Sequence, residues 1–182
     1  MHAIRTLLMA SFLLAKFSLF AQTEDKSEDK KEQAMEIARE AIKLMDEGEY
    51  EESIEILEEA KTLDSTNYIF DYEIGYAHFL QEDYNTAIDS LEAVIEDYDT
   101  IGADLYQLLG NVYDFKEKPK EAIRAYKEGL EMFPNAGRLY LELGVVEAFT
   151  YEDFDKAMEY WETGIEKDPT YSSNYYWAAK LY

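Results

Sequence analysis

The side chains that most often carry out chemistry in proteins are scarce in this sequence. Its 182 residues include no cysteine and two histidines, His2 and His78. The common nucleophile–base pairs and zinc sites depend on cysteine or on histidines that can act together. With 40 acidic residues, the nearness of two carboxylates carries no information about catalysis. We therefore expect no enzymatic activity, no catalytic residue, no metal and no cofactor.

One stretch, Asp97 to Leu108 (DYDTIGADLYQL), partly matches a calcium-binding loop. Asp97, Asp99 and Gly102 stand at its first, third and sixth positions. The fifth and twelfth positions hold Ile101 and Leu108, which lack the oxygen ligands that calcium requires there. We interpret the stretch as a turn between helices.

The net charge of the chain indicates which kinds of partner it can bind. It has 17 basic and 40 acidic residues, a formal net charge of −23. Such a chain repels nucleic acid and anionic lipid, and its single, spaced glycines form no phosphate-binding loop. The charge favours a protein or peptide partner with a neutral or basic segment.

The N-terminal residues 1–21 have the pattern of a secretory signal peptide: a short basic start, an apolar run and a small residue, Ala21. The apolar run is shorter than the roughly 20 residues that span a bilayer, and Lys16 interrupts it. We expect cleavage after Ala21, no membrane insertion afterwards, and a periplasmic or secreted protein. Removing Arg5 and Lys16 leaves 15 basic and 40 acidic residues, a net charge of −25.

Residues 22–33 (QTEDKSEDKKEQ) contain no large apolar side chain, so we predict a charged flexible linker there. From Ala34 onward, small residues recur at steps of 34 or 35 in two independent columns. The first column is Ala41, Gly75, Gly110, Gly144 and Ala179, and the second is Ser53, Ala87, Ala122 and Ala157. Apolar residues within each period follow helical spacing, so each period predicts a helical hairpin.

The two columns have a packing explanation. Antiparallel helices approach closely where one presents a small side chain and the other a large one. In the third period we expect Gly110 and Ala122 to leave the room that Tyr113 and Tyr126 fill. Because a single hairpin cannot bury its apolar face, successive hairpins should stack into an open solenoid.

This pattern resembles the tetratricopeptide repeat of exported bacterial proteins. The residues that carry the resemblance in the third unit are Tyr106, Leu109, Gly110, Tyr113, Ala122, Tyr126, Gly129 and Pro134. The resemblance implies an all-α, right-handed superhelical solenoid with four units, residues 34–67, 68–101, 102–136 and 137–171. Residues 172–182 match the first helix of an incomplete fifth unit. His78 falls in the packing column of Tyr113, which indicates a structural role.

The resemblance also implies that the first helices of the units line a concave groove that binds a partner. The expected groove residues are Tyr72, Tyr76, Phe79, Gln107, Asn111, Arg138, Leu141 and Tyr176. For Tyr72, Tyr76 and Phe79, packing in the core is an equally good interpretation. The two-carboxylate clamp of the family is not reproduced, since Ala38 and Ile42 replace its first lysine and asparagine.

Together these features predict a non-enzymatic exported scaffold that recruits another protein. Two alternatives stay open, both arising from the aromatic residues Tyr175, Tyr176 and Trp177 near residue 182. The array is the N-terminal module of a longer protein whose downstream domain carries the activity, or it associates with itself through this C-terminal helix.

Overall fold

A computed structural model of the chain describes residues 26–181, all of them in helices or in the short connections between helices. The predicted signal peptide, residues 1–21, lies outside the described residues. The chain divides into two compact units, with the boundary between Asn67 and Tyr68. The all-α, antiparallel hairpin architecture expected from the repeat pattern is confirmed.

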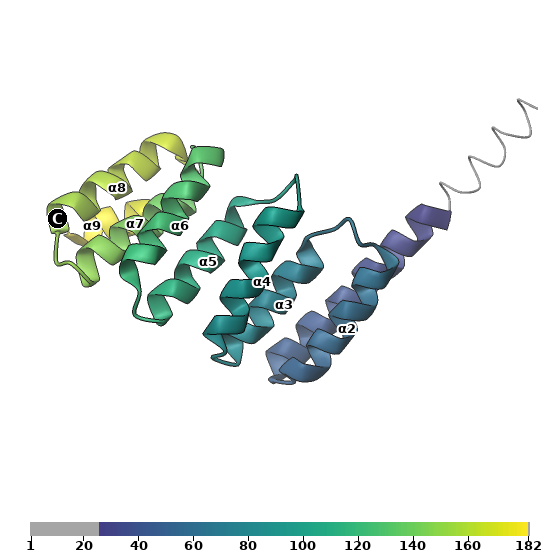
Figure 1. The fold of residues 1–182 in the computed structure, drawn as a ribbon. Helices are drawn as coiled ribbons and strands as arrows, with labels where there is room; N and C mark the ends of the chain where they lie inside the picture. The colour runs from purple at the N-terminus through teal and green to yellow at the C-terminus, as the bar shows by residue number, and fades with distance from the viewer. Residues whose placement is uncertain (1–25, 182) are drawn as a thin grey trace, which may run out of the picture. The chain divides into compact units, whose positions relative to one another are not determined.

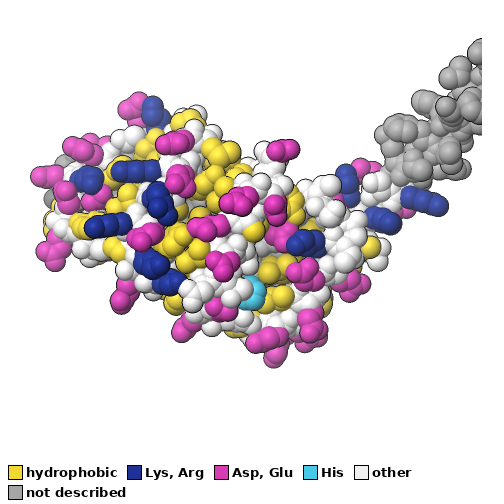
Figure 2. Space-filling view, in the orientation of Figure 1, with side chains coloured by type: hydrophobic (Ala, Val, Ile, Leu, Met, Phe, Trp, Pro, Cys, Tyr) yellow, Lys and Arg dark blue, Asp and Glu magenta, His cyan; other side chains and the backbone are white. Residues whose placement is uncertain are grey.

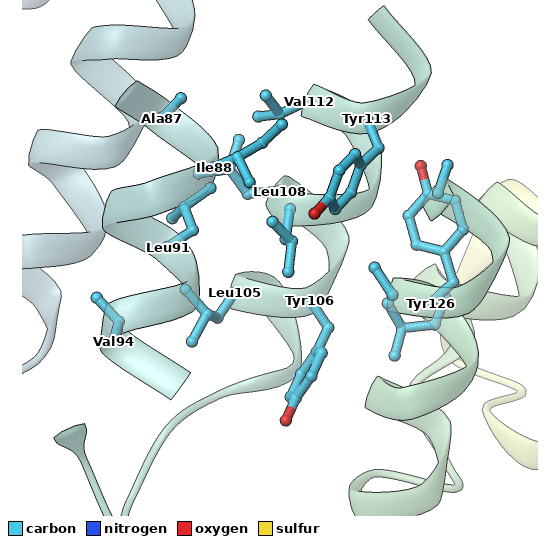
Figure 3. Packing of buried hydrophobic residues seen from close by; sticks show 14 of the residues in the cluster. Ala87, Ile88, Leu91, Val94, Leu105, Tyr106, Leu108, Val112, Tyr113 and Tyr126 are labelled. Atoms are coloured by element: carbon cyan, nitrogen blue, oxygen red, sulfur yellow. The ribbon is translucent and has the colours of Figure 1, made fainter. Parts of the chain in front are cut away.

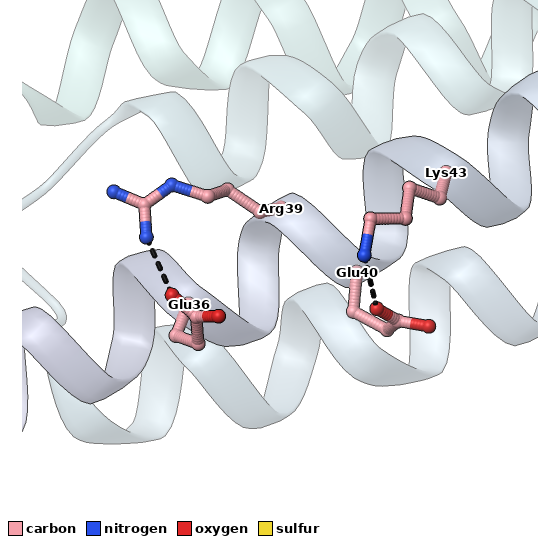
Figure 4. A network of polar contacts seen from close by, with 4 residues as sticks. All are labelled: Glu36, Arg39, Glu40 and Lys43. Carbon is pink, nitrogen blue, oxygen red and sulfur yellow. Dashed lines mark hydrogen bonds and ion pairs between the residues drawn. The ribbon is translucent and has the colours of Figure 1, made fainter.

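The first unit contains one helical hairpin, a helix over residues 26–47 followed by α2 (Tyr50–Leu63). Gly48 links the two helices with a φ of +87°, a conformation that glycine adopts without steric cost. Ala41, Leu57 and Ala60 are completely buried between the helices. On the exposed side, Glu36 pairs with Arg39 and Glu40 with Lys43, one turn apart (Figure 4).

The prediction of a flexible linker over residues 22–33 is wrong for residues 26–33, which belong to this helix. Residues 26–33 form its first two turns, although every one of them is exposed. The composition correctly indicated solvation, but charged residues such as Glu and Lys are also good helix formers and extend a helix that is anchored further along. Burial, not the helix, begins at Ala34.

The second unit is a row of three further hairpins and one unpaired helix (Figure 1). Its helices are α3 (Ile69–Leu80), α4 (Tyr84–Asp97), α5 (Ala103–Phe115), α6 (Pro119–Met132), α7 (Gly137–Phe149), α8 (Phe154–Lys167) and α9 (Ser172–Leu181). Pro119 occupies the first position of α6, as expected for a residue whose missing N–H costs nothing there.

The turns inside the hairpins share one backbone feature that the sequence did not suggest. Glu82, Glu117 and Glu152 have φ values of +61°, +58° and +55°, at positions that repeat every 35 residues. Asp83 and Asp153 follow directly and cap α4 and α8, accepting hydrogen bonds from the backbone N–H groups three residues on. A non-glycine residue in this conformation is strained, so the caps and the hairpin packing must hold these turns.

Each hairpin of the second unit closes around a glycine on its first helix. A Cβ added at Gly110 would stand 2.1 Å from a ring carbon of Tyr126, and one at Gly144 would stand 2.2 Å from Nε1 of Trp161. Tyr126 and Trp161 are 1% exposed, so both rings are enclosed by the rest of the unit. Tyr113, expected to fill the same gap, instead donates a hydrogen bond from its hydroxyl to Glu92 of α4, 2.6 Å away, and so ties α5 to the preceding hairpin.

The main buried cluster of the unit extends from α4 to α7, and a second, smaller cluster joins α7, α8 and α9. Figure 3 shows Leu91 of α4, Leu105 and Leu108 of α5, and Tyr126 of α6 within one cluster. Successive hairpins also meet at glycines, because a Cβ at Gly129 of α6 would lie 2.7 Å from Leu139 of α7. Each hairpin therefore packs on the next through its second helix.

Replacing Gly110 by Ala tests the ring-on-glycine contact. Alanine favours a helix by about 1 kcal/mol over glycine, so a loss of stability appears only if the clash with Tyr126 is larger. We expect a net loss of about 1–3 kcal/mol in the free energy of unfolding, measured by urea denaturation. Ala93→Leu, at an exposed helical position of α4, is the control and should change it by less than about 0.5 kcal/mol. An unchanged Gly110→Ala protein would contradict this packing.

Candidate functional site

The first helices of the hairpins form one layer of the second unit and the second helices form the other. α3 contacts α5, α5 contacts α7 and α7 contacts α9, whereas within the described part of the chain α4, α6 and α8 make no comparable contacts with one another. Helices lie closer together on the inside of a curve than on the outside. We therefore call the surface formed by α3, α5, α7 and α9 the inner face.

The predicted groove residues all lie on these four helices. Tyr72, Tyr76 and Phe79 belong to α3, Gln107 and Asn111 to α5, Arg138 and Leu141 to α7, and Tyr176 to α9. All except Tyr176 are half-buried, and Tyr176 is 60% exposed. That they contact a partner stays a prediction.

Tyr72 shows how α3, α5 and α7 converge on the inner face. Burial raises the pKa of its hydroxyl to about 12, and the negative charges of Glu73 and Asp104 contribute. The positive charge of Arg138 on α7 acts in the opposite direction. Arg138 itself pairs with Asp104 of α5 at 3.8 Å.

The aromatic residues of α3 pack against the core and are also partly exposed at the surface. Tyr72, Tyr76 and Phe79 pack against the buried cluster, and the ring centre of Phe79 lies 6.1 Å from that of Tyr76. Phe79 also meets Phe115 edge to face at 5.1 Å. Phe79 therefore belongs to a ring cluster at the edge of the inner face, which supports the packing interpretation for this residue.

Polar side chains of the inner face are joined by hydrogen bonds. Gln107 donates from Nε2 to Oε1 of Glu142 at 2.7 Å, and the hydroxyl of Tyr126 donates to Oδ1 of Asn111 at 2.7 Å. The amide oxygen of Asn111 is thus used within the chain. A hydrogen bond from Asn111 to a bound peptide would come from its Nδ2.

Two acidic residues of the inner face were missed by the sequence analysis, Glu73 and Glu142. Each follows a predicted groove residue, and both are half-buried, as is Asp114 of α5. Burial raises the pKa of each of these three carboxyl groups above its usual range. For Glu142, the hydrogen bond from Gln107 opposes the rise and the charge of Asp114 adds to it. Among 40 acids in the sequence, nothing except helix position distinguished them.

The inner face is consequently acidic. The helices α3, α5 and α7 together carry six acidic residues and one arginine, Arg138, but Glu147 is buried and pairs with Lys156 of α8. The other five acids are Asp71, Glu73, Asp104, Asp114 and Glu142. Figure 2 shows that carboxylates also outnumber basic side chains on the outer surface in view. What distinguishes the inner face is the partial burial of its carboxylates.

A hollow of about 470 Å³ opens at one end of this face, where α5 and α7 begin. Asp104, Arg138, Asp168 and Tyr171 contribute to its wall, together with the turn over residues 132–137. The hydroxyl of Thr170 donates a hydrogen bond to the carboxylate of Asp168 and lowers its pKa, and backbone N–H groups, that of Gly137 among them, add to this effect. The hollow therefore presents charges of both signs beside half-buried rings.

Other candidate sites find no support in the described residues. No three acidic, histidine or cysteine side chains within residues 26–181 are placed to share a metal ion. The calcium-like stretch is split between the last residue of α4, a loop and the first half of α5. His78 lies half-buried in α3, and its Nδ1 has no hydrogen-bond partner among the described atoms. In the same part of the chain, every helix is too short or too polar to cross a membrane.

Comparison with known proteins connects this geometry to a family. Models of the tetratricopeptide repeat match residues 44–67 and 103–136, and residues 71–100. The crystal structure of MamA is similar at 30% sequence identity, over 74% of this chain and 77% of that one, with a TM-score of 0.60.

Two further solved structures are similar. YrrB, described as a tetratricopeptide repeat protein with an unusual peptide-binding site, has 25% identity over 88% of this chain and 81% of that one, with a TM-score of 0.56. PilF of Pseudomonas aeruginosa has 16% identity over 84% and 69%, with a TM-score of 0.67, and shares the fold.

The raised pKa of Glu142 predicts a pH dependence of stability. Because the folded state binds this proton more tightly than the unfolded state, the free energy of unfolding falls as the pH rises through the folded pKa. Glu142→Gln removes this cost and can keep the bond from Gln107. At pH 7 we expect the variant to be more stable, by about 1.4 kcal/mol for each pH unit by which folding raises the pKa of Glu142. At pH 4 its stability should be little changed.

Urea denaturation at the two pH values measures this difference. Glu128→Gln is the control, because Glu128 lies on α6 with an exposed side chain whose ion pair with Arg124 is exposed as well. Such a pair contributes less than about 0.5 kcal/mol, so stability should be nearly unchanged at both pH values. Destabilisation of Glu142→Gln at pH 7 would show that the ionised carboxylate is favoured by the fold.

Proposed function

Because the chain belongs to the tetratricopeptide repeat family, we propose that its inner face binds a basic segment of another protein and holds that protein in an assembly. The observation that carries this proposal is the set of half-buried carboxylates, Glu73, Asp114 and Glu142, on three adjacent helices. Arg138, the single cation of α3, α5 and α7, already faces Asp104. A lysine or arginine of the partner would supply the missing positive charge.

The affinity comes from the difference between the free and the bound state of these carboxylates. In the free protein they are partly removed from water without a full counter-charge, which the raised pKa values of Glu73, Asp114 and Glu142 express. A charge-assisted hydrogen bond from a lysine or arginine favours the ionised carboxylate and contributes about 1.5–3 kcal/mol. Tyr72 and Tyr76 lie on α3, the helix that carries Glu73, and a ring beside a bound cation would add a cation–π contact.

Rigidity of the inner face supports binding of this kind. The hydrogen bonds of Gln107 and Asn111 and the packed rings of α3 hold the surface in one arrangement before a partner arrives. A preformed surface loses less side-chain entropy on binding than a flexible one. YrrB, a structurally similar protein described as having an unusual peptide-binding site, offers a precedent within the fold.

We place this activity outside the cytoplasm, in the periplasm or beyond. The support is the sequence of residues 1–21, with its basic start, apolar run and small residue at Ala21. The scaffold would then recruit its partner at the cell envelope, as a binding protein without chemistry of its own.

A peptide-binding measurement tests the basic-segment proposal. An extended twelve-residue peptide of alternating Lys and Ser should bind the chain in isothermal titration calorimetry, and the matched Glu–Ser peptide should not. The double variant Asp114→Asn with Glu142→Gln should weaken binding about tenfold or more, the equivalent of about 1.4 kcal/mol. Glu128→Gln, on the outer helix α6, should bind as the unchanged chain does. Equal binding by the double variant and the unchanged chain would refute the proposed site.

Export has its own test. In the native host, the protein should appear in the periplasmic or secreted fraction, with the mass of a chain that begins at Gln22. Leu13→Arg, which breaks the apolar run, should leave the uncleaved chain in the cytoplasm. An uncleaved, cytoplasmic wild-type chain would remove the export proposal without affecting the peptide measurement.

A further inference from the structure

One aromatic side chain of the inner face is far more exposed than the packing of the repeats requires. Phe115, the last residue of α5, is 63% exposed. Asn111, Asp114 and Phe115 are spaced i, i+3 and i+4, so they share one side of α5. Because Asn111 belongs to the inner face, Asp114 and Phe115 belong to it as well.

The exposure of Phe115 arises in the middle of the array. The hairpin of α3 and α4 precedes α5, and the hairpin of α7 and α8 follows α6. α5 contacts α3, α4, α6 and α7. The neighbouring helices are therefore in place on both sides, and the ring is still open to solvent.

The ring of Phe115 is held in position by its neighbours. It meets Phe79 of α3 edge to face at 5.1 Å, and its centre lies 6.4 Å from that of Tyr84, the first residue of α4. Phe79 and Tyr84 are half-buried and pack on the main cluster. Lys116 donates a hydrogen bond from Nζ to Oδ1 of Asn85, which ties the end of α5 to the start of α4. A ring held in this way needs little ordering on contact.

A half-buried carboxylate directly precedes this exposed ring in the chain. Burial raises the pKa of Asp114, and within residues 26–181 no hydrogen bond or ion pair to its carboxylate compensates for the lost water. The charge of Asp114 also raises the pKa of Glu142 on α7. Phe115 therefore has ring partners on α3 and α4, and uncompensated negative charge lies between α5 and α7.

Among α3, α5 and α7, only α5 combines an exposed ring with such a carboxylate. The positions of Asp114 and Phe115 correspond to residues 79–80 of α3, which are both apolar, and to residues 148–149 of α7. Phe149 is as exposed as Phe115, at 63%, but the residue before it is a buried alanine. The combination is thus a feature of one helix and not of the repeat.

We propose that Phe115 anchors a large apolar side chain of the bound segment, next to the lysine or arginine that pairs with Asp114. This inference rests on the proposed function and describes the partner more closely, as a segment in which an apolar residue adjoins a basic one. The apolar side chain packs on the exposed surface of the Phe115 ring, and the neighbouring cation reaches the carboxylate. A few anchors of this kind supply most of the binding energy of an interface.

The charges around the rings of Phe79, Tyr84 and Phe115 favour such a segment. Residues 82–85 and 114–118 carry four acids and two lysines, a net charge of −2. α3 and α5 both end beside these rings, and the partial negative charge at the C-terminus of a helix favours a cation. A second copy of the chain, with its net charge of −23, would bring carboxylates together here.

Isothermal titration calorimetry with two peptides tests the proposal. One is the peptide of alternating Lys and Ser, and the other is the same peptide with one central serine replaced by phenylalanine. The chain should bind the phenylalanine peptide about tenfold more tightly, the equivalent of about 1.4 kcal/mol. Phe115→Ala should reduce this ratio to near one, and Phe115→Tyr, which keeps a ring, should retain it. Phe149→Ala is the matched control, an equally exposed ring without a neighbouring acid, and should also retain the ratio.

The outcomes separate this inference from the proposed function. If the Lys–Ser peptide binds and the phenylalanine peptide binds no more tightly, or if Phe115→Ala retains the tenfold ratio, the inference is wrong and the proposed function stands. Absence of binding by both peptides would remove both. A dimer in sedimentation velocity that Phe115→Ala abolishes would show that a second copy covers the ring, and would overturn the inference.

Thermal unfolding followed by circular dichroism checks the variant itself. Because the ring of Phe115 is mostly exposed, Phe115→Ala should unfold at nearly the same temperature as the unchanged chain. Phe115→Tyr provides the same comparison of peptides with the ring contacts to Phe79 and Tyr84 kept.

Discussion

The structure depends on the contact between an aromatic ring and a glycine in the facing helix. Gly110 and Gly144 bring their hairpin partners so close that even a methyl group would collide with Tyr126 or Trp161. Because these rings are fully buried, the contact sets both the distance and the register of the two helices. The turns with strained Glu82, Glu117 and Glu152 connect helices whose separation the rings already define.

Close hairpins stacked on one another give two layers with different spacing. In the second unit, each first helix contacts the first helix of the next hairpin, whereas among the residues described there α4, α6 and α8 contact only helices of the first layer. Side chains between the close-packed first helices are half-buried without belonging to the core. This intermediate burial is what raises the pKa of Glu73, Asp114 and Glu142, and it is the physical basis of the proposal that the inner face binds a basic segment.

The same contact explains why α9 differs from the helices before it. Tyr175 and Ala179 repeat the spacing of Tyr106 and Gly110, but they meet no opposing helix among residues 26–181. A surface that is buried everywhere else in the unit is thus exposed at one end.

The sequence by itself determined the hairpins, their period and the residues of the packing columns, because small and aromatic side chains at fixed spacing leave few other ways to bury apolar surface. It also placed Tyr72, Gln107 and Arg138 on the correct layer. It did not determine which of 40 acids are half-buried, nor that residues 26–33 continue a helix, nor that the amide oxygen of Asn111 is taken by Tyr126. Burial and hydrogen-bond partners depend on neighbours about 15–35 residues away, so only the tertiary structure decided them.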